Sequence, residues 1–152
     1  MFKTLVCATA IVAAAVSNAS AQNVDWRGSA LITAASNCDA VNIGPGSVLN
    51  ARYRHPGLGD NGVSARITFL ANYIATNLTD PNGDFSNSFQ AVKGTFVGGG
   101  GLAYNATLRM LSRTPGITEN TSPVVITGIV RNFMRVPGNP SCQITFEFSG
   151  MR

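Results

Sequence analysis

Several short stretches of this chain alternate between apolar and polar residues, as β-strands do when one face of a sheet is buried. In the stretch 26–36, apolar or small residues fall at every second position: Trp26, Gly28, Ala30, Ile32 and Ala34. In the stretch 142–149, one face carries Cys142, Ile144, Phe146 and Phe148. The same pattern predicts further strands at roughly 47–55, 63–78, 85–97, 102–113 and 122–131. These features indicate an all-β domain.

Glycine and asparagine mark where these strands turn. The segments Gly59–Gly62 and Asp80–Gly83 each contain an Asn-Gly pair, which tolerates the positive φ angles of tight hairpins, and a run of glycines follows at 98–101. The segment 63–78 is ambiguous, because its apolar residues alternate as in a strand and also recur at helical spacing. Its β-branched and aromatic residues favour a strand.

The first residues of the chain have the layout of a secretory signal peptide. A basic residue precedes an apolar run from Leu5 to Val16, and the small residues Ala19 and Ala21 predict cleavage near Ala21. The run is too short to span a bilayer, which takes about 20 apolar residues. We therefore expect a signal peptide over 1–21, a single β domain over 22–152, and a secreted or periplasmic protein that does not span the membrane.

Two of the three cysteines, Cys38 and Cys142, remain after this cleavage. In an oxidising compartment we expect them to form a disulfide bond. The bond would close a loop over most of the domain and stabilise it by at most ~4–5 kcal/mol in the chain-entropy model. Two free buried thiols are the alternative. Because Cys38 follows the first strand and Cys142 begins the last, the bond forms most easily if these strands are antiparallel neighbours.

Pairing of the first and last strands is how an up-and-down barrel closes. The register that sets the two cysteines opposite each other places Ile32 against Phe148. It also places Ala34 against Phe146, so that the apolar faces agree. A closed meander needs an even number of strands, whereas the pattern gives seven. We therefore expect an antiparallel up-and-down barrel of about eight strands, with Arg131–Val136 as a short eighth strand; a two-sheet β-sandwich is the alternative.

Basic residues outnumber acidic ones modestly, with 11 Lys and Arg against 7 Asp and Glu. After the leader, all basic residues except Lys93 are arginines that stand singly along the chain. Nucleic-acid binding needs clustered positive charge, so we expect no nucleic-acid partner. One histidine and two oxidised cysteines do not supply a zinc site. The sequence predicts no metal and no cofactor.

The stretch RYRHPGLGDNG, residues 52–62, concentrates the polar chemistry of the chain. In a strand, Tyr53 and His55 share one face, and the two arginines share the other. Pro56 and the glycines that follow it end the strand. Arginines at a strand end can make bidentate contacts with a carboxylate or a phosphate. The candidate binding residues are Arg52, Tyr53, Arg54, His55 and Asp60. The alternative is a strand end whose arginines face solvent and whose histidine lies at the edge of the core.

The segments WRGSALITA and ARYRHPGLGDNG, together with the cysteine pair, resemble a group of small secreted proteins of alphaproteobacteria that carry no assigned activity. The resemblance implies a periplasmic or extracellular location. It supplies no catalytic residue.

Candidate catalytic groups are few in this chain. The G-x-S-x-G motif of serine hydrolases does not occur, and the sequence pairs no two carboxylates. We therefore expect a non-catalytic binding module for a small ligand or a protein partner. One alternative is an enzyme that uses a carboxylate pair or His55 at the barrel mouth, which would bring two such groups into one pocket. A small outer-membrane barrel is a lesser alternative, since those barrels are apolar outside and polar inside.

Overall fold

The computed structural model describes residues 25–56, 64–71, 74–81, 83–97, 102–118, 120–135, 138 and 140–152. The predicted signal peptide over 1–21 and Asp60 of the candidate site lie outside these residues. Within the described ranges, no helix is long and apolar enough to cross a membrane.

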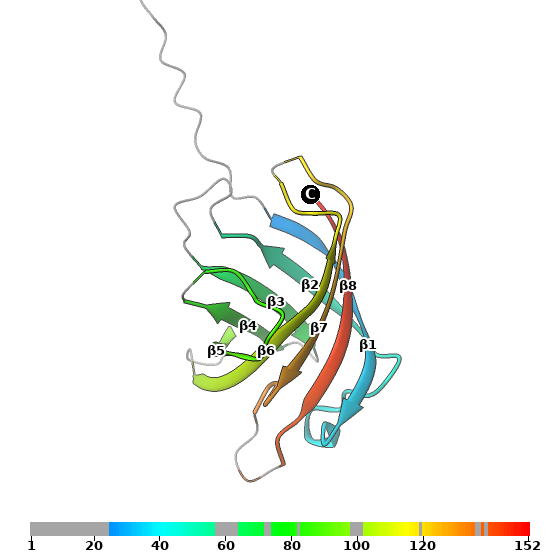
Figure 1. Cartoon of the computed structure of the whole chain (residues 1–152). Helices are drawn as coiled ribbons and strands as arrows, with labels where there is room; N and C mark the ends of the chain where they lie inside the picture. Colours follow the sequence, from blue (N-terminus) through cyan, green and yellow to red (C-terminus); the bar gives the residue numbers. More distant parts are fainter. Residues whose placement is uncertain are drawn as a thin grey trace, which may run out of the picture.

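In the described part of the chain, eight antiparallel strands form one closed barrel (Figure 1). The strands are β1 (Asp25–Ser36), β2 (Val48–Arg54), β3 (Ala65–Ala71), β4 (Ile74–Asp80), β5 (Gln90–Val97), β6 (Ala103–Thr114), β7 (Val124–Arg131) and β8 (Gln143–Met151). Each strand pairs with the next in sequence, and β8 pairs with β1. Among the described residues the helical structure is one 3-10 turn, η1 (Asp39–Val41). The prediction of an up-and-down barrel is confirmed, and the alternative of a sandwich is not.

The eighth strand arises within the segment 63–78, which the pattern predicted as one strand. β3 ends at Ala71 and β4 begins at Ile74, and these two residues face each other across the pair. The sequence carries no sign of this hairpin, because neither glycine nor proline interrupts the alternation of apolar and polar residues there. The prediction of an eighth strand at Arg131–Val136 is wrong, because β7 ends at Arg131 and the buried Phe133 inserts into the core.

β5 begins at Gln90, later than the predicted start near 85. A serine turn precedes it: the Ser86 amide donates to Oε1 of Gln90 at 2.8 Å, and the Ser88 amide donates to Oγ of Ser86 at 3.2 Å. Side-chain oxygens of this kind compete with the sheet for backbone donors. The turn leaves Asp84 at the end of the barrel wall, in the connection between β4 and β5.

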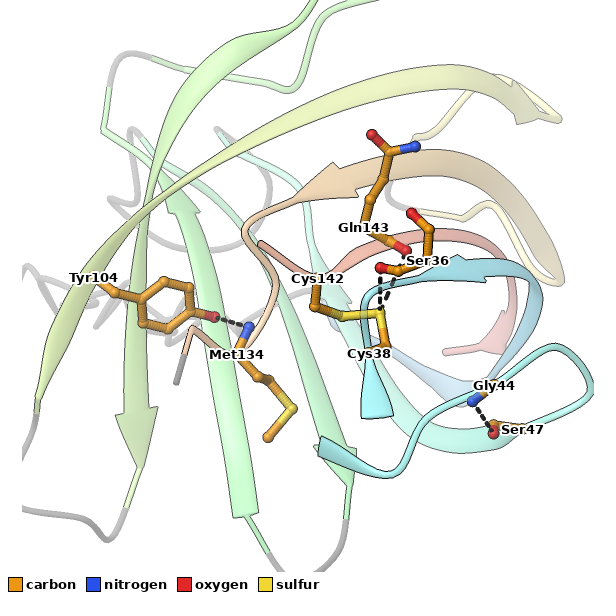
Figure 2. The surroundings of a disulfide bond; sticks show 8 residues. All are labelled: Ser36, Cys38, Gly44, Ser47, Tyr104, Met134, Cys142 and Gln143. Carbon is orange, nitrogen blue, oxygen red and sulfur yellow. Dashed lines mark hydrogen bonds between the residues drawn. A yellow bond between two sulfur atoms is a disulfide. The ribbon is translucent and has the colours of Figure 1, made fainter. Parts of the chain in front are cut away.

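A disulfide bond joins Cys38 and Cys142, as predicted (Figure 2). Their Cα atoms lie 4.5 Å apart, although 104 positions separate them in sequence. The apolar faces of β1 and β8 meet, but the register is offset by one pleat: Ile32 pairs with Phe146 rather than with the residue two positions later. A β-bulge between Ile32 and Ala34 accounts for one residue of this two-residue offset, and Ala34, expected inside, is exposed.

Aromatic side chains fill the interior of the barrel. The largest fully buried rings are Trp26, Tyr53, Phe69, Phe133, Phe146 and Phe148. Phe69 contacts two other rings edge-on, with centroids 5.2 and 5.3 Å away. Gly94 gives a further ring room, because a Cβ there would lie 2.3 Å from the ring of Tyr104. An eight-stranded barrel is just wide enough for such a filling, so the outer wall and the mouths are where a partner can bind.

Candidate functional site

β2 sends neighbouring residues of the candidate site to opposite sides of the barrel wall. Tyr53 is fully buried inside, and His55 follows on the same side just beyond the strand. Arg52 and Arg54 lie on the outer side, where both contact Asp25. The four described residues that were predicted as one site therefore belong to two clusters.

Tyr53, His55, Asp84 and Arg113 form the inner cluster, which we call the mouth cluster because β2, β4 and β6 end near it. The carboxylate of Asp84 lies at its centre. Oδ1 accepts a hydrogen bond from Oη of Tyr53 at 2.8 Å, and Oδ2 forms an ion pair with Arg113. Nε2 of His55 lies 3.4 Å from Oδ2, and Nη1 of Arg113 also donates to Oη of Tyr53 at 3.2 Å. Every member of the cluster thus contacts Asp84.

Burial and the Asp84 carboxylate together fix the protonation of the mouth cluster. Burial raises the pKa of Tyr53 far above its usual range, and the charge of Asp84 raises it further. Burial would lower the pKa of Arg113, but the hydrogen bond and the charge of Asp84 outweigh burial and raise it. The cluster therefore holds a neutral phenol beside a permanently charged guanidinium.

Both ring nitrogens of His55 face hydrogen-bond acceptors. Nδ1 donates to the carbonyl oxygen of Pro56 at 2.6 Å, and Nε2 faces Asp84. A general base needs a ring nitrogen that faces the substrate, whereas both nitrogens of His55 face groups of the chain itself. His55 and a carboxyl group do meet at the mouth, as the enzyme alternative requires, but their geometry is that of a cross-link between chain segments. Among the described residues, no group of three or more His, Cys, Asp or Glu could hold a metal ion.

Arginines from three strands form the outer cluster. Arg27 on β1 lies directly opposite Arg52 on β2, and Arg54 lies directly opposite Arg66 on β3. We call these four residues the arginine face. Like charges directly opposite each other destabilise a sheet, so folding alone does not account for two such pairs side by side.

One carboxylate, Asp25, partly neutralises the arginine face. Its side chain is only 5% exposed; Oδ1 accepts a hydrogen bond from Nε of Arg54 at 3.0 Å, and Oδ2 forms an ion pair with Arg52. Burial would raise the pKa of Asp25, but the hydrogen bonds and charges of the two arginines outweigh burial and lower it. No ion pair involves Arg27 or Arg66 within the described part of the chain. Among the described residues, the arginine face therefore carries more positive than negative charge.

A hollow of about 270 Å³ opens on the arginine face. It is lined by Asp25, Arg52, Arg54, Arg66, Thr68, Ala75, Asn77 and Val97. Across it Oγ1 of Thr68 donates to Oδ1 of Asn77 at 2.6 Å, and Nε of Arg52 is buried without a hydrogen-bond partner among the described atoms. Guanidinium groups around such a hollow present donors in the forked geometry that matches carboxylate, sulfate and phosphate oxygens.

Sequence reasoning found the two arginines of β2 but missed Arg27 and Arg66. The alternation within each strand places both of them outward, which was an available signal. The register between β1, β2 and β3 decides that they become neighbours, and the hydrophobic pattern alone does not give it. Sequence reasoning also missed Asp84 and Arg113, because only the closed barrel brings these residues next to His55.

Comparisons of the chain with protein-family models, with curated proteins and with solved structures find no match. Its function must therefore be argued from the geometry of its own residues.

Proposed function

We propose that this protein is a secreted or periplasmic, non-catalytic binding module that binds an anionic partner through the arginine face. The observation that carries the proposal is that Arg27 stands opposite Arg52 and Arg54 opposite Arg66 in the sheet, with Asp25 as the one carboxylate that contacts them among the described residues. A bound anion would relieve this repulsion and supply an acceptor to the buried donor of Arg52. Each charge-assisted hydrogen bond of this kind contributes about 1.5–3 kcal/mol.

The size of the hollow favours one charged group of a larger partner. Its volume of about 270 Å³ is smaller than that of sites which enclose a whole organic ligand, roughly 300–1,000 Å³. We therefore favour a partner, such as an acidic polymer or an acidic protein surface, that inserts one carboxylate or sulfate group and lays further charges along the sheet.

Three observations support the location. The residues 1–21 have the layout of a signal peptide, and the segments around Trp26 and Arg52 resemble small secreted proteins of alphaproteobacteria. The Cys38–Cys142 disulfide bond is compatible with an oxidising compartment.

The distribution of charge argues against the alternative of an outer-membrane barrel. Such barrels turn apolar side chains outward and polar ones inward. Here the interior is aromatic and aliphatic, and exposed outer positions of the strands mix charged residues such as Arg27, Arg66, Lys93 and Glu147 with apolar ones such as Leu31 and Val125.

The proposal is tested by binding purified protein to dextran sulfate, with uncharged dextran as the matched control polymer. We expect binding to dextran sulfate that weakens as salt is added, because salt screens exposed charges. The variant Arg27→Gln/Arg66→Gln should bind about tenfold more weakly or worse. The control variant is Arg109→Gln/Arg131→Gln, which removes the same charge from exposed positions on β6 and β7.

Equal loss of affinity in the two variants would overturn the proposal, because it would show a response to net charge rather than to the arginine face. Binding of uncharged dextran with the same affinity would also overturn it.

A further inference from the structure

A second and larger hollow lies along β5 and β6. Its volume is about 650 Å³, within the range of roughly 300–1,000 Å³ that is typical of sites for small organic ligands. The two strands supply most of its lining, and Pro81, Leu102 and Arg135 complete it. Neither the arginine face nor the mouth cluster contributes a residue, so the proposed function does not account for it.

The lining of this hollow is mostly apolar but carries positive charge. Seven of its ten residues are apolar or aromatic, among them Val92, Phe96, Leu102 and Tyr104. The three polar ones are Lys93, Asn105 and Arg135. Both charged residues are cations, and no carboxylate is among the described residues that line the hollow. Such a lining complements a molecule with an apolar body and one negative group.

The aromatic part of the lining is held in place by the fold. The ring of Tyr104 lies 5.1 Å from that of Phe96. Oη of Tyr104 lies 2.8 Å from Oγ1 of Thr76. It also accepts a hydrogen bond from the Met134 amide at 3.2 Å, as Figure 2 shows. Leu102, by contrast, is 68% exposed, and a ligand in the hollow would cover part of it. The ring of Tyr104 is already fixed, so an apolar ligand would lose little free energy in ordering the site. The ligand would also remove apolar surface of Leu102 from water, which favours binding.

We infer that this hollow binds a small amphipathic organic anion, with a hydrocarbon or aromatic body against Phe96 and Leu102 and a carboxylate or sulfonate near Lys93 and Arg135. The inference is independent of the proposed function, because it rests on different residues and a different class of ligand.

The probe for this site is 1-anilinonaphthalene-8-sulfonate, whose fluorescence rises when it leaves water. The variant Lys93→Gln/Arg135→Gln removes both cations and should raise the dissociation constant of the probe about tenfold. The variant Ala103→Trp places an indole in the hollow from an exposed position and should abolish binding. Two variants that leave the lining intact, Arg27→Gln/Arg66→Gln and Arg109→Gln/Arg131→Gln, should bind the probe like the wild type.

Competition separates the negative group from the apolar body. Dodecanoate should displace the probe at a concentration about tenfold lower than dodecanol, because only the carboxylate contacts the cations. Circular dichroism of each variant checks that it is folded.

Three results would overturn the inference: no fluorescence increase with the wild type, unchanged binding by folded Ala103→Trp, or equal displacement by the acid and the alcohol. None of them bears on dextran sulfate binding at the arginine face, so this inference and the proposed function fail separately.

Discussion

The mouth cluster and the arginine face both include residues of β2. They differ in how many of their charged side chains have a partner of opposite charge. In the mouth cluster, the carboxylate of Asp84 contacts Arg113, Tyr53 and His55, and of these side chains Tyr53 is fully buried. In the arginine face, the carboxylate of Asp25 holds two of four arginines, and the other two have no ion-pair partner within the described ranges.

The difference teaches how to distinguish a structural ion network from a binding surface in a barrel wall. A network whose hydrogen bonds and ion pairs converge on one shared carboxylate links segments of the chain and occupies that carboxylate. A surface on which like charges face each other in register lowers the stability of the sheet and gains from a partner of opposite charge. Successive side chains of a strand point to opposite faces. Tyr53 of β2 therefore belongs to the structural ion network inside the barrel, whereas its neighbours Arg52 and Arg54 belong to the binding surface outside.

Removal of the central carboxylate of the mouth cluster should have the largest effect on folding. Asp84→Ala leaves the partly buried guanidinium of Arg113 without its ion pair, and we expect a loss of about 2–3 kcal/mol in the free energy of unfolding by urea. The exposed Asp39→Ala is the control and should change it by no more than about 0.5 kcal/mol. Dextran sulfate affinity should stay at the wild-type value. A marked loss of affinity in folded Asp84→Ala would contradict the separation of the two clusters.

Removal of the two arginines of β2 should affect both folding and binding. Arg52→Ala/Arg54→Ala leaves Asp25 buried without its charged partners, so we expect the free energy of unfolding to fall by about 1–2 kcal/mol and the affinity for dextran sulfate to fall as well.

The addition of Asp25→Asn to this double variant separates the two effects. It removes the buried charge and should restore most of the stability, as measured by urea unfolding, without restoring binding. Failure to restore stability would show that the arginines act through packing rather than through Asp25.

The free energy of unfolding should fall at both ends of the pH range. The acid limb of this profile should depend on Asp25, and the alkaline limb on the buried phenols of Tyr53 and Tyr104. The pKa of Asp25 is lowered in the folded state, so its contribution is present above the unfolded value of about 3.9 and is lost as the pH falls through the lower folded value. The pKa of Tyr53 and that of Tyr104 are raised by burial, so their contribution is present below about pH 10 and is lost as the pH rises.

Urea unfolding at a series of pH values tests this assignment. Asp25→Asn should flatten the acid limb and leave the alkaline limb, whereas Tyr53→Phe should reduce the alkaline limb only. Absorbance at 295 nm gives a second check, because Tyr53 and Tyr104 should ionise only when the barrel unfolds. Ionisation of Tyr53 in the folded protein near pH 10 would contradict its burial in the mouth cluster, and ionisation of Tyr104 there would contradict the burial of its ring beside β5.

The hydrophobic pattern predicted the barrel because alternation, turn residues and one cysteine pair are local or nearly local signals. It missed the β3–β4 hairpin, since no glycine or proline stands between positions 65 and 80, and it misplaced the β1–β8 register because a bulge after Ile32 leaves no mark in the alternation. Of the arginine face and Asp25, only the residues that lie on β2 were predicted. Arg52 and Arg54 stand out in the sequence, whereas Arg27, Arg66 and Asp25 become their neighbours only through pairing with β1 and β3.

The smallest effect on folding should come from Arg27 and Arg66, which have no ion-pair partner among the described residues. Arg27→Gln/Arg66→Gln removes both like-charge pairs, and we expect the free energy of unfolding to rise by about 0.2–1 kcal/mol. Urea unfolding at low salt measures it best, because added salt screens the repulsion. A loss of more than about 1 kcal/mol would mean that these arginines stabilise the fold and would remove the basis of the proposed function.

The most direct test of the account is the melting temperature of three proteins in dextran sulfate relative to dextran: the wild type, Asp84→Ala and Arg27→Gln/Arg66→Gln. A ligand that binds only the folded state raises the melting temperature in proportion to its binding free energy. We predict equal rises for the wild type and Asp84→Ala, although the latter melts lower, and little or no rise for Arg27→Gln/Arg66→Gln. An equal rise in all three proteins, or a rise lost only in Asp84→Ala, would contradict the account.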